Sequence, residues 1–293
     1  MAIQTATTGN LENAQNIIIG QIRYTGEHND PCRNLIENFK LGKGNKQLTI
    51  PKVGQMSAQD LTDGVDLVDS EDIGMTSVDL TCSEVGLKVI LTKKLLRQEQ
   101  EDMFKVVGKQ AGDAMSRKVD TDIIALFSAL NGGTVLGADN KNLFLSNAAA
   151  CVGWTKAHKV PRPIAAVHNP NAILFLTKNA AGVGTSSFSG VLGDYAVDKL
   201  KDFWKINVGG VSFYEDGNIA KISGYDSGYG AIFSKSAMAF IESQAMEVDR
   251  EFDASLRAWE LVVTSDYGCF EIDDSYGAAM QYEIGDLTTS ATE

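Results

Sequence analysis

The stretch at residues 256–280, "LRAWELVVTSDYGCFEIDDSYGAAM", decides how this sequence is interpreted, because it could form either the wall of an active site or a structural element. A long hydrophobic strand is followed by two Tyr-Gly steps, Tyr267-Gly268 and Tyr276-Gly277, beside Asp273-Asp274. Neighbouring residues of a strand point to opposite faces, so we expect the two aspartates not to act together on one substrate. A glycine beside an aromatic residue is typical of a point where a strand bends and the ring fills the space. The stretch therefore predicts architecture.

The composition is that of a folded chain with about two lobes. The 293 residues are 44% hydrophobic and 22% charged, with only 5 prolines. A net charge of −12 repels phosphate, and we find no local basic patch, so sequence-specific DNA binding is disfavoured. The first 20 residues have neither a basic start nor a long apolar run, so we expect no signal peptide, no membrane contact and an intracellular origin.

The cysteines give no metal or disulfide pattern. Cys32, Cys82, Cys151 and Cys269 stand 50 or more positions apart without a C-x-x-C pair, so we expect reduced and mostly buried thiols. The Gly/Ser loop at 182–190 lacks the Gly-Lys-Ser/Thr ending of a phosphate-binding loop. No cofactor and no metal are predicted.

The first third of the chain predicts an arm and an extended hairpin. Residues 1–39 are rich in Asn and Gln, with at most one short helix after Pro31, near 34–39. Strands are predicted at 46–53 and 78–92. Between them, residues 54–76 hold six acidic residues and no Lys or Arg, which does not fit a Ca²⁺-binding loop and is too acidic to bury. The six are Asp60, Asp63, Asp66, Asp69, Glu71 and Asp72.

The rest of the chain predicts an α+β body. Apolar residues at a spacing of three or four from 94 to 130 predict a strut-like helix of roughly 50 Å, ended by Gly132-Gly133. Asn169-Pro170 is typical of a helix start, and that helix would close at Gly182. A further helix is expected at 192–204, short strands at 205–215 and 230–234, and a long strand pair at 246–272.

Taken in order, these parts resemble the major capsid protein of tailed bacteriophages, which has the Hong Kong 97-like fold. The resemblance covers nearly the whole chain and is carried by the element order and the closing stretch, where Arg257-Ala258-Trp259 leads into a hydrophobic strand and then the two Tyr-Gly steps. It implies an N-terminal arm (1–39), an extended hairpin loop (40–92), a spine helix with the peripheral domain (93–159) and an axial domain (160–235). The long β arm of the peripheral domain (236–265) and a return to the axial domain with the C-terminus (266–293) would complete the fold.

The resemblance also implies a function, which is structural and not enzymatic. Copies would assemble in the host bacterial cytoplasm into hexamers and pentamers of an icosahedral head, part of a virion that encloses double-stranded DNA bound only non-specifically. A separate scaffolding protein is implied, since 40-odd N-terminal residues are too few for a built-in scaffold, and a portal would also be a partner. No Lys-Asn cross-linking pair is carried over.

The acidic hairpin is expected to contact basic surface on a neighbouring copy. The candidate partners of the six acidic residues are Lys93, Lys94 and Arg97, or Lys105 and Lys109, at the predicted strut helix.

Three alternatives stay open. An encapsulin-type nanocompartment shell would use the same fold around enzyme cargo. A cytoplasmic α+β enzyme would need a nucleophile and base close together, for which Cys151 and His158 are the candidates. A phage tail component is disfavoured by the long helix, because such proteins tend to be all-β.

Overall fold

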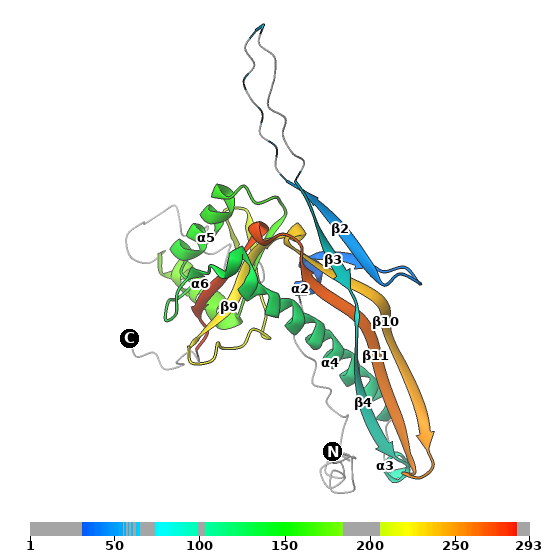
Figure 1. Ribbon diagram of the computed structural model, residues 1–293. Helices are drawn as coiled ribbons and strands as arrows, with labels where there is room; N and C mark the ends of the chain where they lie inside the picture. Colours follow the sequence, from blue (N-terminus) through cyan, green and yellow to red (C-terminus); the bar gives the residue numbers. More distant parts are fainter. Residues whose placement is uncertain are drawn as a thin grey trace.

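The structure is a computed structural model that describes residues 31–54, 74–98, 103–183 and 206–285, together with residues 56, 58, 60, 63 and 64 (Figure 1). It contains two main sheets, one long helix beside them and a separate two-stranded hairpin. The predicted mixture of helices and strands is confirmed.

The larger sheet has six strands in the order β5-β12-β9-β6-β8-β7. Helices α5 and α6 supply Val152 and Leu176 to its core, where they meet Phe213 of β8 and Met280 of β12. The strands are β5 (Leu136–Gly137), β6 (Ile164–His168), β7 (Ile206–Val208), β8 (Val211–Glu215), β9 (Ser227–Ser234) and β12 (Gly277–Glu283), and the helices are α5 (Leu145–Ala157) and α6 (Pro170–Val183).

The second sheet has four strands in the order β1-β10-β11-β4, with helix α4 lying along it (Figure 1). Met115 of α4 packs on Val263 of β11, and Phe127, just after α4, joins a core with Phe233 and Phe240 that connects the two sheets. The strands are β1 (Glu37–Lys40), β4 (Ser83–Thr92), β10 (Met238–Asp253) and β11 (Ala258–Glu271), and the helices are α2 (Cys32–Leu35), α3 (Lys93–Gln98) and α4 (Met103–Leu126).

The hairpin consists of β2 (Gln47–Val53) and β3 (Met75–Thr81), paired antiparallel from Gln47 opposite Thr81 to Val53 opposite Met75. Its root is packed, where Leu80 is buried against Ile241 of β10 and the partly buried Leu48 and Ile50. The predicted projecting hairpin is confirmed for these residues.

Several predicted elements are confirmed. The long strand pair is β10 with β11, and Asn169 starts α6 by accepting a hydrogen bond from the Asn171 amide at 2.9 Å. The strand structure expected at 205–215 is β7 and β8, which the structure pairs as a hairpin across Gly209-Gly210. Helix α6 ends at Val183, one residue beyond the expected Gly182. The helix predicted at 192–204 lies outside the described residues.

Two local predictions are wrong. The short helix is α2, and residues Glu37–Lys40 form strand β1, which pairs parallel with β10. The single strand expected at 78–92 is divided at Cys82, because β3 pairs with β2 whereas β4 pairs with β11. The predicted strut is described as α3 and α4, and regular α-helix ends at Leu126 before a 3₁₀ turn, Phe127–Ala129.

The division into domains stays a prediction, but the packing bears on its boundaries. Helix α5 and strand β5, which fall within the stretch expected to be peripheral, belong to the six-stranded sheet and its core. Strand β11 continues in the four-stranded sheet to Glu271, beyond the expected boundary at 265, and only β12 returns to the six-stranded sheet.

The first Tyr-Gly step lies at a close approach of two backbones. A Cβ atom added at Gly268 would lie 2.2 Å from the Thr81 carbonyl oxygen, so no other residue fits without movement. Tyr267 is buried, stacks on Phe240 at 5.6 Å between ring centroids, and donates a hydrogen bond to Asp122 Oδ2 at 2.8 Å. The step therefore locks β11 against the end of β3 and against helix α4.

Candidate subunit interface

Two of the predicted acidic residues are described, and both lie beyond the β2–β3 pair. Asp60 and Asp63 are exposed, and Gly64 beside them has a positive φ of 80°. The other four acidic candidates, Asp66, Asp69, Glu71 and Asp72, lie outside the described residues. The backbone hydrogen bond from Gly54 N to Gly74 O, at 3.3 Å, closes the described part of the hairpin below them.

The basic candidates lie at the opposite end of the four-stranded sheet. Lys93, Lys94 and Arg97 are exposed on α3, which begins where β4 ends, while the hairpin joins the other end of β4 (Figure 1). Ten residues of strand separate the two ends, or roughly 33 Å at about 3.3 Å per residue. One chain therefore does not bring these acidic and basic groups together. Lys105 lies where no side chain is described, and Lys109 is exposed on α4.

One basic candidate is already partly engaged. The Lys93 Nζ lies 4.3 Å from the centre of the Phe252 ring, and the Lys93 backbone amide donates to the Arg257 carbonyl at 2.9 Å. Phe252 in turn packs on Trp259, with 5.2 Å between ring centroids. These contacts fix the end of the β10–β11 pair to the start of α3.

Large apolar side chains are exposed on the two projecting elements. On the hairpin, Val53 is 54% exposed and Met75 is 67% exposed, and Met56 is also exposed. On the β10–β11 pair, Met246, Val248 and Leu256 are exposed, and the run from Ser243 to Glu251 is exposed on both faces of β10. Apolar side chains that cluster on protruding surfaces mark contact sites for other molecules.

An ion pair holds the end of β2 that leads toward the hairpin tip. Lys52 Nζ of β2 lies 2.7 Å from Asp273 Oδ2, and the Asp273 carboxylate also accepts hydrogen bonds from the Ser275 amide and hydroxyl. Burial acts to raise the pKa of Asp273, but the hydrogen bonds from Lys52 and Ser275 outweigh it and hold this pKa below its usual value.

The prediction that Asp273 and Asp274 are neighbours within a strand is wrong. Asp274 begins a 3₁₀ turn, Asp274–Tyr276. Asp273 precedes this turn and caps it with its side chain. Asp274 interacts with Glu271, whose pKa is raised to about 7 by burial and by the hydrogen bond and negative charge of Asp274. These carboxylates lie at the crossover between the two sheets, where Asp273 meets the tip-side end of β2.

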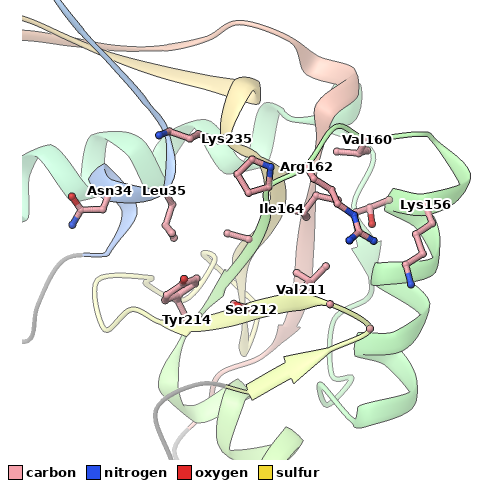
Figure 2. A pocket seen from close by; sticks show the side chains of 15 residues that line it. Asn34, Leu35, Lys156, Val160, Arg162, Ile164, Val211, Ser212, Tyr214 and Lys235 are labelled. Carbon is pink, nitrogen blue, oxygen red and sulfur yellow. The ribbon is translucent and has the colours of Figure 1, made fainter.

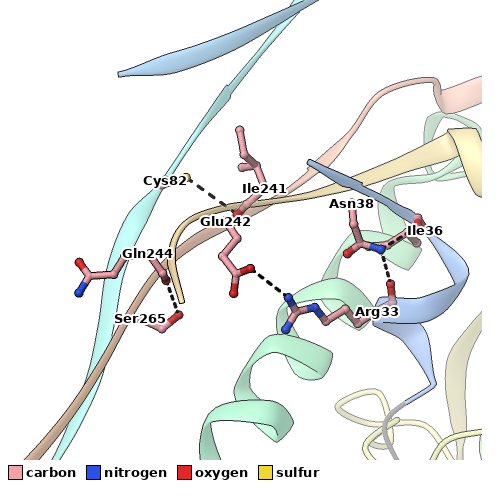
Figure 3. A network of polar contacts seen from close by, with 8 residues as sticks. All are labelled: Arg33, Ile36, Asn38, Cys82, Ile241, Glu242, Gln244 and Ser265. Atoms are coloured by element: carbon pink, nitrogen blue, oxygen red, sulfur yellow. Dashed lines mark hydrogen bonds and ion pairs between the residues drawn. The ribbon is translucent and has the colours of Figure 1, made fainter. Parts of the chain in front are cut away.

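A polar network fixes the place where β10 leaves the body (Figure 3). Arg33 lies 3.4 Å from Glu242 and 4.4 Å from the centre of the Phe240 ring, which ties the N-terminal segment to β10. Immediately after Glu242 the pairing with β11 shifts register twice, and Ser265 donates to the Gln244 carbonyl at 3.2 Å. The exposed outer half of β10 therefore starts at an anchored, irregular point.

A basic pocket of about 620 Å³ lies between α2, the loop before β6 and the β7–β8 hairpin (Figure 2). Its lining includes Lys156, Arg162 and Lys235 and no acidic residue. The floor is made of apolar and backbone atoms, including Ile164 and Val211. The pocket therefore has the charge of an anion-binding surface.

The proposed Cys151–His158 pair is not supported as a catalytic site. Cys151 is buried, its Sγ lies 3.4 Å from the Tyr282 hydroxyl, and burial raises the pKa of the thiol. His158 lies two helical turns away, and its ring stacks on Trp154 at 4.3 Å. The other described histidine, His168, ends β6 and is fully buried.

One group of side chains has the composition of a metal site. Cys32, Asp120 and Asp216 are all buried, and their ligand atoms lie within 4.8 Å of one another. Sequence analysis missed this group, because its members are as far as 184 positions apart and share no spacing motif. None of the described helices has the length and apolar character needed to cross a membrane.

Comparisons with known proteins place the fold. No family model matches the sequence, and no curated protein matches it. Among solved structures, the chain is similar to the capsid of an empty gene transfer agent (GTA) particle, with a TM-score of 0.69, 12% identity and coverage of 96% of this chain and 100% of that chain.

Two phage structures show the same likeness. The capsid of cyanophage P-SCSP1u gives a TM-score of 0.65 at 12% identity, covering 92% of each chain. Mycobacterium phage Che8 gives 0.62 at 16% identity, covering 80% of this chain and 84% of that chain. The chain therefore has the fold of tailed-phage capsid proteins, as its sequence suggested.

Proposed function

We propose that this chain is a major capsid protein whose copies form the hexamers and pentamers of an icosahedral head around double-stranded DNA. The observation that carries the proposal is the likeness to a GTA capsid over 96% of the chain, including the elements that project from the body. The hairpin and outer β10 pack against few other residues of their own subunit. We expect this where neighbouring copies cover such elements in an assembly.

The shell would gain its stability from many modest contacts. Each subunit in a closed symmetric assembly meets several neighbours, so weak individual interfaces add up. The role is structural and not catalytic. A separate scaffolding protein and a portal would complete assembly in the host bacterial cytoplasm, and the net charge of −12 suits a wall that binds packaged DNA only non-specifically.

The acidic end of the hairpin is proposed to reach the α3 cations of a neighbour. Asp60 and Asp63 are exposed at one end of the sheet, and Lys94 and Arg97 are exposed at the other. Such a contact requires a second chain, because the two ends of one chain are far apart.

A charge-swap experiment tests both proposals. Purified subunits would be assembled and observed by electron microscopy and sedimentation. Shells or capsomers are expected from the unaltered chain, and a persistent monomer under all conditions, with the scaffold also supplied, would overturn the capsid assignment. Asp60→Lys with Asp63→Lys, or Lys94→Glu with Arg97→Glu, should weaken assembly, and the combination of all four should restore it.

The control for the swap is Lys43→Glu, an exposed charge change near the hairpin root. This variant should assemble close to normally. In all of the variants, the free energy of unfolding of the subunit should stay close to that of the unaltered chain. Shells that form normally from both single-sided variants would contradict the proposed contact while leaving the capsid assignment intact.

A further inference from the structure

Three chain segments far apart in the sequence bring polar side chains to one buried point. Cys32 comes from α2, Asp120 from α4, and Asp216 from the turn after β8; with Asn218 we call them the Cys32 cluster. The Cys32 thiol donates to Asp216 Oδ2 at 3.2 Å, and the Asn218 side chain donates to Asp120 Oδ2 at 3.0 Å. The Asn218 amide donates to Asp216 Oδ1 at 2.8 Å.

Within the described part of the chain, no cation acts on the carboxylates of the Cys32 cluster. Asp120 and Asp216 are each only 1% exposed, and ionised carboxylates are costly to bury unless a positive charge faces them. Burial and the neighbouring Asp216 raise the pKa of Asp120 to about 7, and the other groups that act on it, Asn218 and Cys32, are not cations. Within the described residues, Asp120 Oδ1 is buried and has no hydrogen-bond partner.

We propose that Cys32, Asp120 and Asp216 bind one divalent cation of the zinc class. The unpartnered Asp120 Oδ1 is the observation that points to a ligand beyond the residues themselves. A thiolate with two carboxylates suits a borderline cation such as Zn²⁺, whereas Ca²⁺ and Mg²⁺ prefer all-oxygen sites.

The spacing of the donor atoms fits such an ion. Bond lengths of about 2.0–2.3 Å put ligand atoms roughly 3.5 Å apart around a tetrahedral ion. The group's atoms already lie within 4.8 Å of one another, so small side-chain rotations suffice. Binding would release the Cys32 thiol proton to solvent, and three protein ligands leave one position for water.

The bound ion would add metal–ligand bonds between parts of the molecule that already meet through apolar contacts and the hydrogen bonds above. It would join the N-terminal segment, the long helix and the six-stranded sheet across 184 sequence positions. This inference does not depend on shell assembly, since it concerns the single subunit.

The test is metal binding by the full-length unassembled chain. The chain would be stripped with a chelator, incubated with Zn²⁺, passed through a desalting column and analysed for metal by mass spectrometry. One Zn²⁺ per chain is expected, with a higher Tm than the stripped chain. Co²⁺ in place of Zn²⁺ should give the absorption band of a thiolate–cobalt bond.

Matched variants locate the site. Cys32→Ser should abolish the cobalt–thiolate band, and the near-isosteric Asp120→Asn should lower Zn²⁺ affinity at least tenfold. Cys151→Ser, which alters another buried thiol in α5, should retain metal and band. The proposal is overturned if the unaltered chain retains no stoichiometric Zn²⁺, shows no cobalt–thiolate band and has an unchanged Tm. It is also overturned if Cys32→Ser and Asp120→Asn both bind metal like the unaltered chain.

Discussion

Gly268 is required by space and not by backbone conformation. A Cβ at this position would meet the Thr81 carbonyl oxygen at 2.2 Å, and a backbone atom cannot rotate away. We expect Gly268→Ala to lower the free energy of unfolding by about 1–3 kcal/mol, as overpacking does. Urea unfolding of the subunit measures it.

The control is Gly153→Ala, in the exposed face of α5, where an added Cβ meets no atom within 4 Å. Alanine there should raise the free energy of unfolding by up to about 1 kcal/mol, because glycine disfavours helix. Equal effects of the two substitutions would contradict the close approach of β11 to β3.

His168 makes stability depend on pH. Its Nδ1 accepts a hydrogen bond from the Asn169 amide at 2.9 Å, which assigns the proton to Nε2, and burial lowers its pKa to about 4. A lowered folded-state pKa means that the unfolded chain binds more protons. The contribution of neutral His168 to the free energy of unfolding is therefore fully present above about pH 6.5. It is lost as the pH falls toward 4, and the total loss is about 3 kcal/mol.

The measurement compares the free energy of unfolding at pH 7 and pH 5 in the unaltered chain and in His168→Phe. The unaltered chain should lose about 2 kcal/mol more over this interval than the variant. Glu271, with its raised pKa of about 7, acts in the opposite direction, and it cancels because both chains carry it. The same pH slope in both chains would show that His168 does not titrate in this way.

At the scale of elements, Lys52 is expected to hold the hairpin to the crossover between the sheets. Lys52→Met would leave the carboxylate of Asp273, which is 95% buried, without its cation. We expect a loss of about 1–3 kcal/mol and faster amide hydrogen exchange in β2 and β3. Lys46→Met, at an exposed position just before β2, serves as the control. Unchanged exchange in the Lys52 variant would mean that apolar packing at Leu80 suffices.

Elements defined by their own residues were predictable, and elements defined by distant partners were not. Asn169-Pro170 caps α6 through a local hydrogen bond, so its signal lies in the sequence. Residues Glu37–Lys40 form a strand only because β10 lies beside them, and Cys82 divides two strands because their partners differ. The same reason hid the Cys32 cluster and the pairing of Lys52 with Asp273.

At the scale of the whole molecule, large apolar side chains of the described residues are exposed mainly on the hairpin and on the β10–β11 pair, which extend away from the body. The candidate charges could be selected from the sequence, since an acidic run and a basic helix start are local features. Their positions at opposite ends of β4 could not be predicted, because they depend on which strands pair. Because of that separation, a contact between the described acidic residues and the α3 cations must join two different chains.

Val248 on outer β10 tests whether this apolar surface is buried between copies. It is 49% exposed and lies opposite Val263 of β11, so Val248→Thr keeps the β-branched shape while adding a hydroxyl. We expect the subunit's free energy of unfolding to change by less than about 0.5 kcal/mol, as at other surface positions. The concentration needed for assembly should rise several-fold, because each interface loses apolar burial at about 25 cal/mol per Å². Light scattering across a concentration series measures this threshold, and Glu251→Gln on the same exposed strand is the control. An equal threshold for the unaltered chain and both variants would mean that outer β10 stays in solvent in the shell.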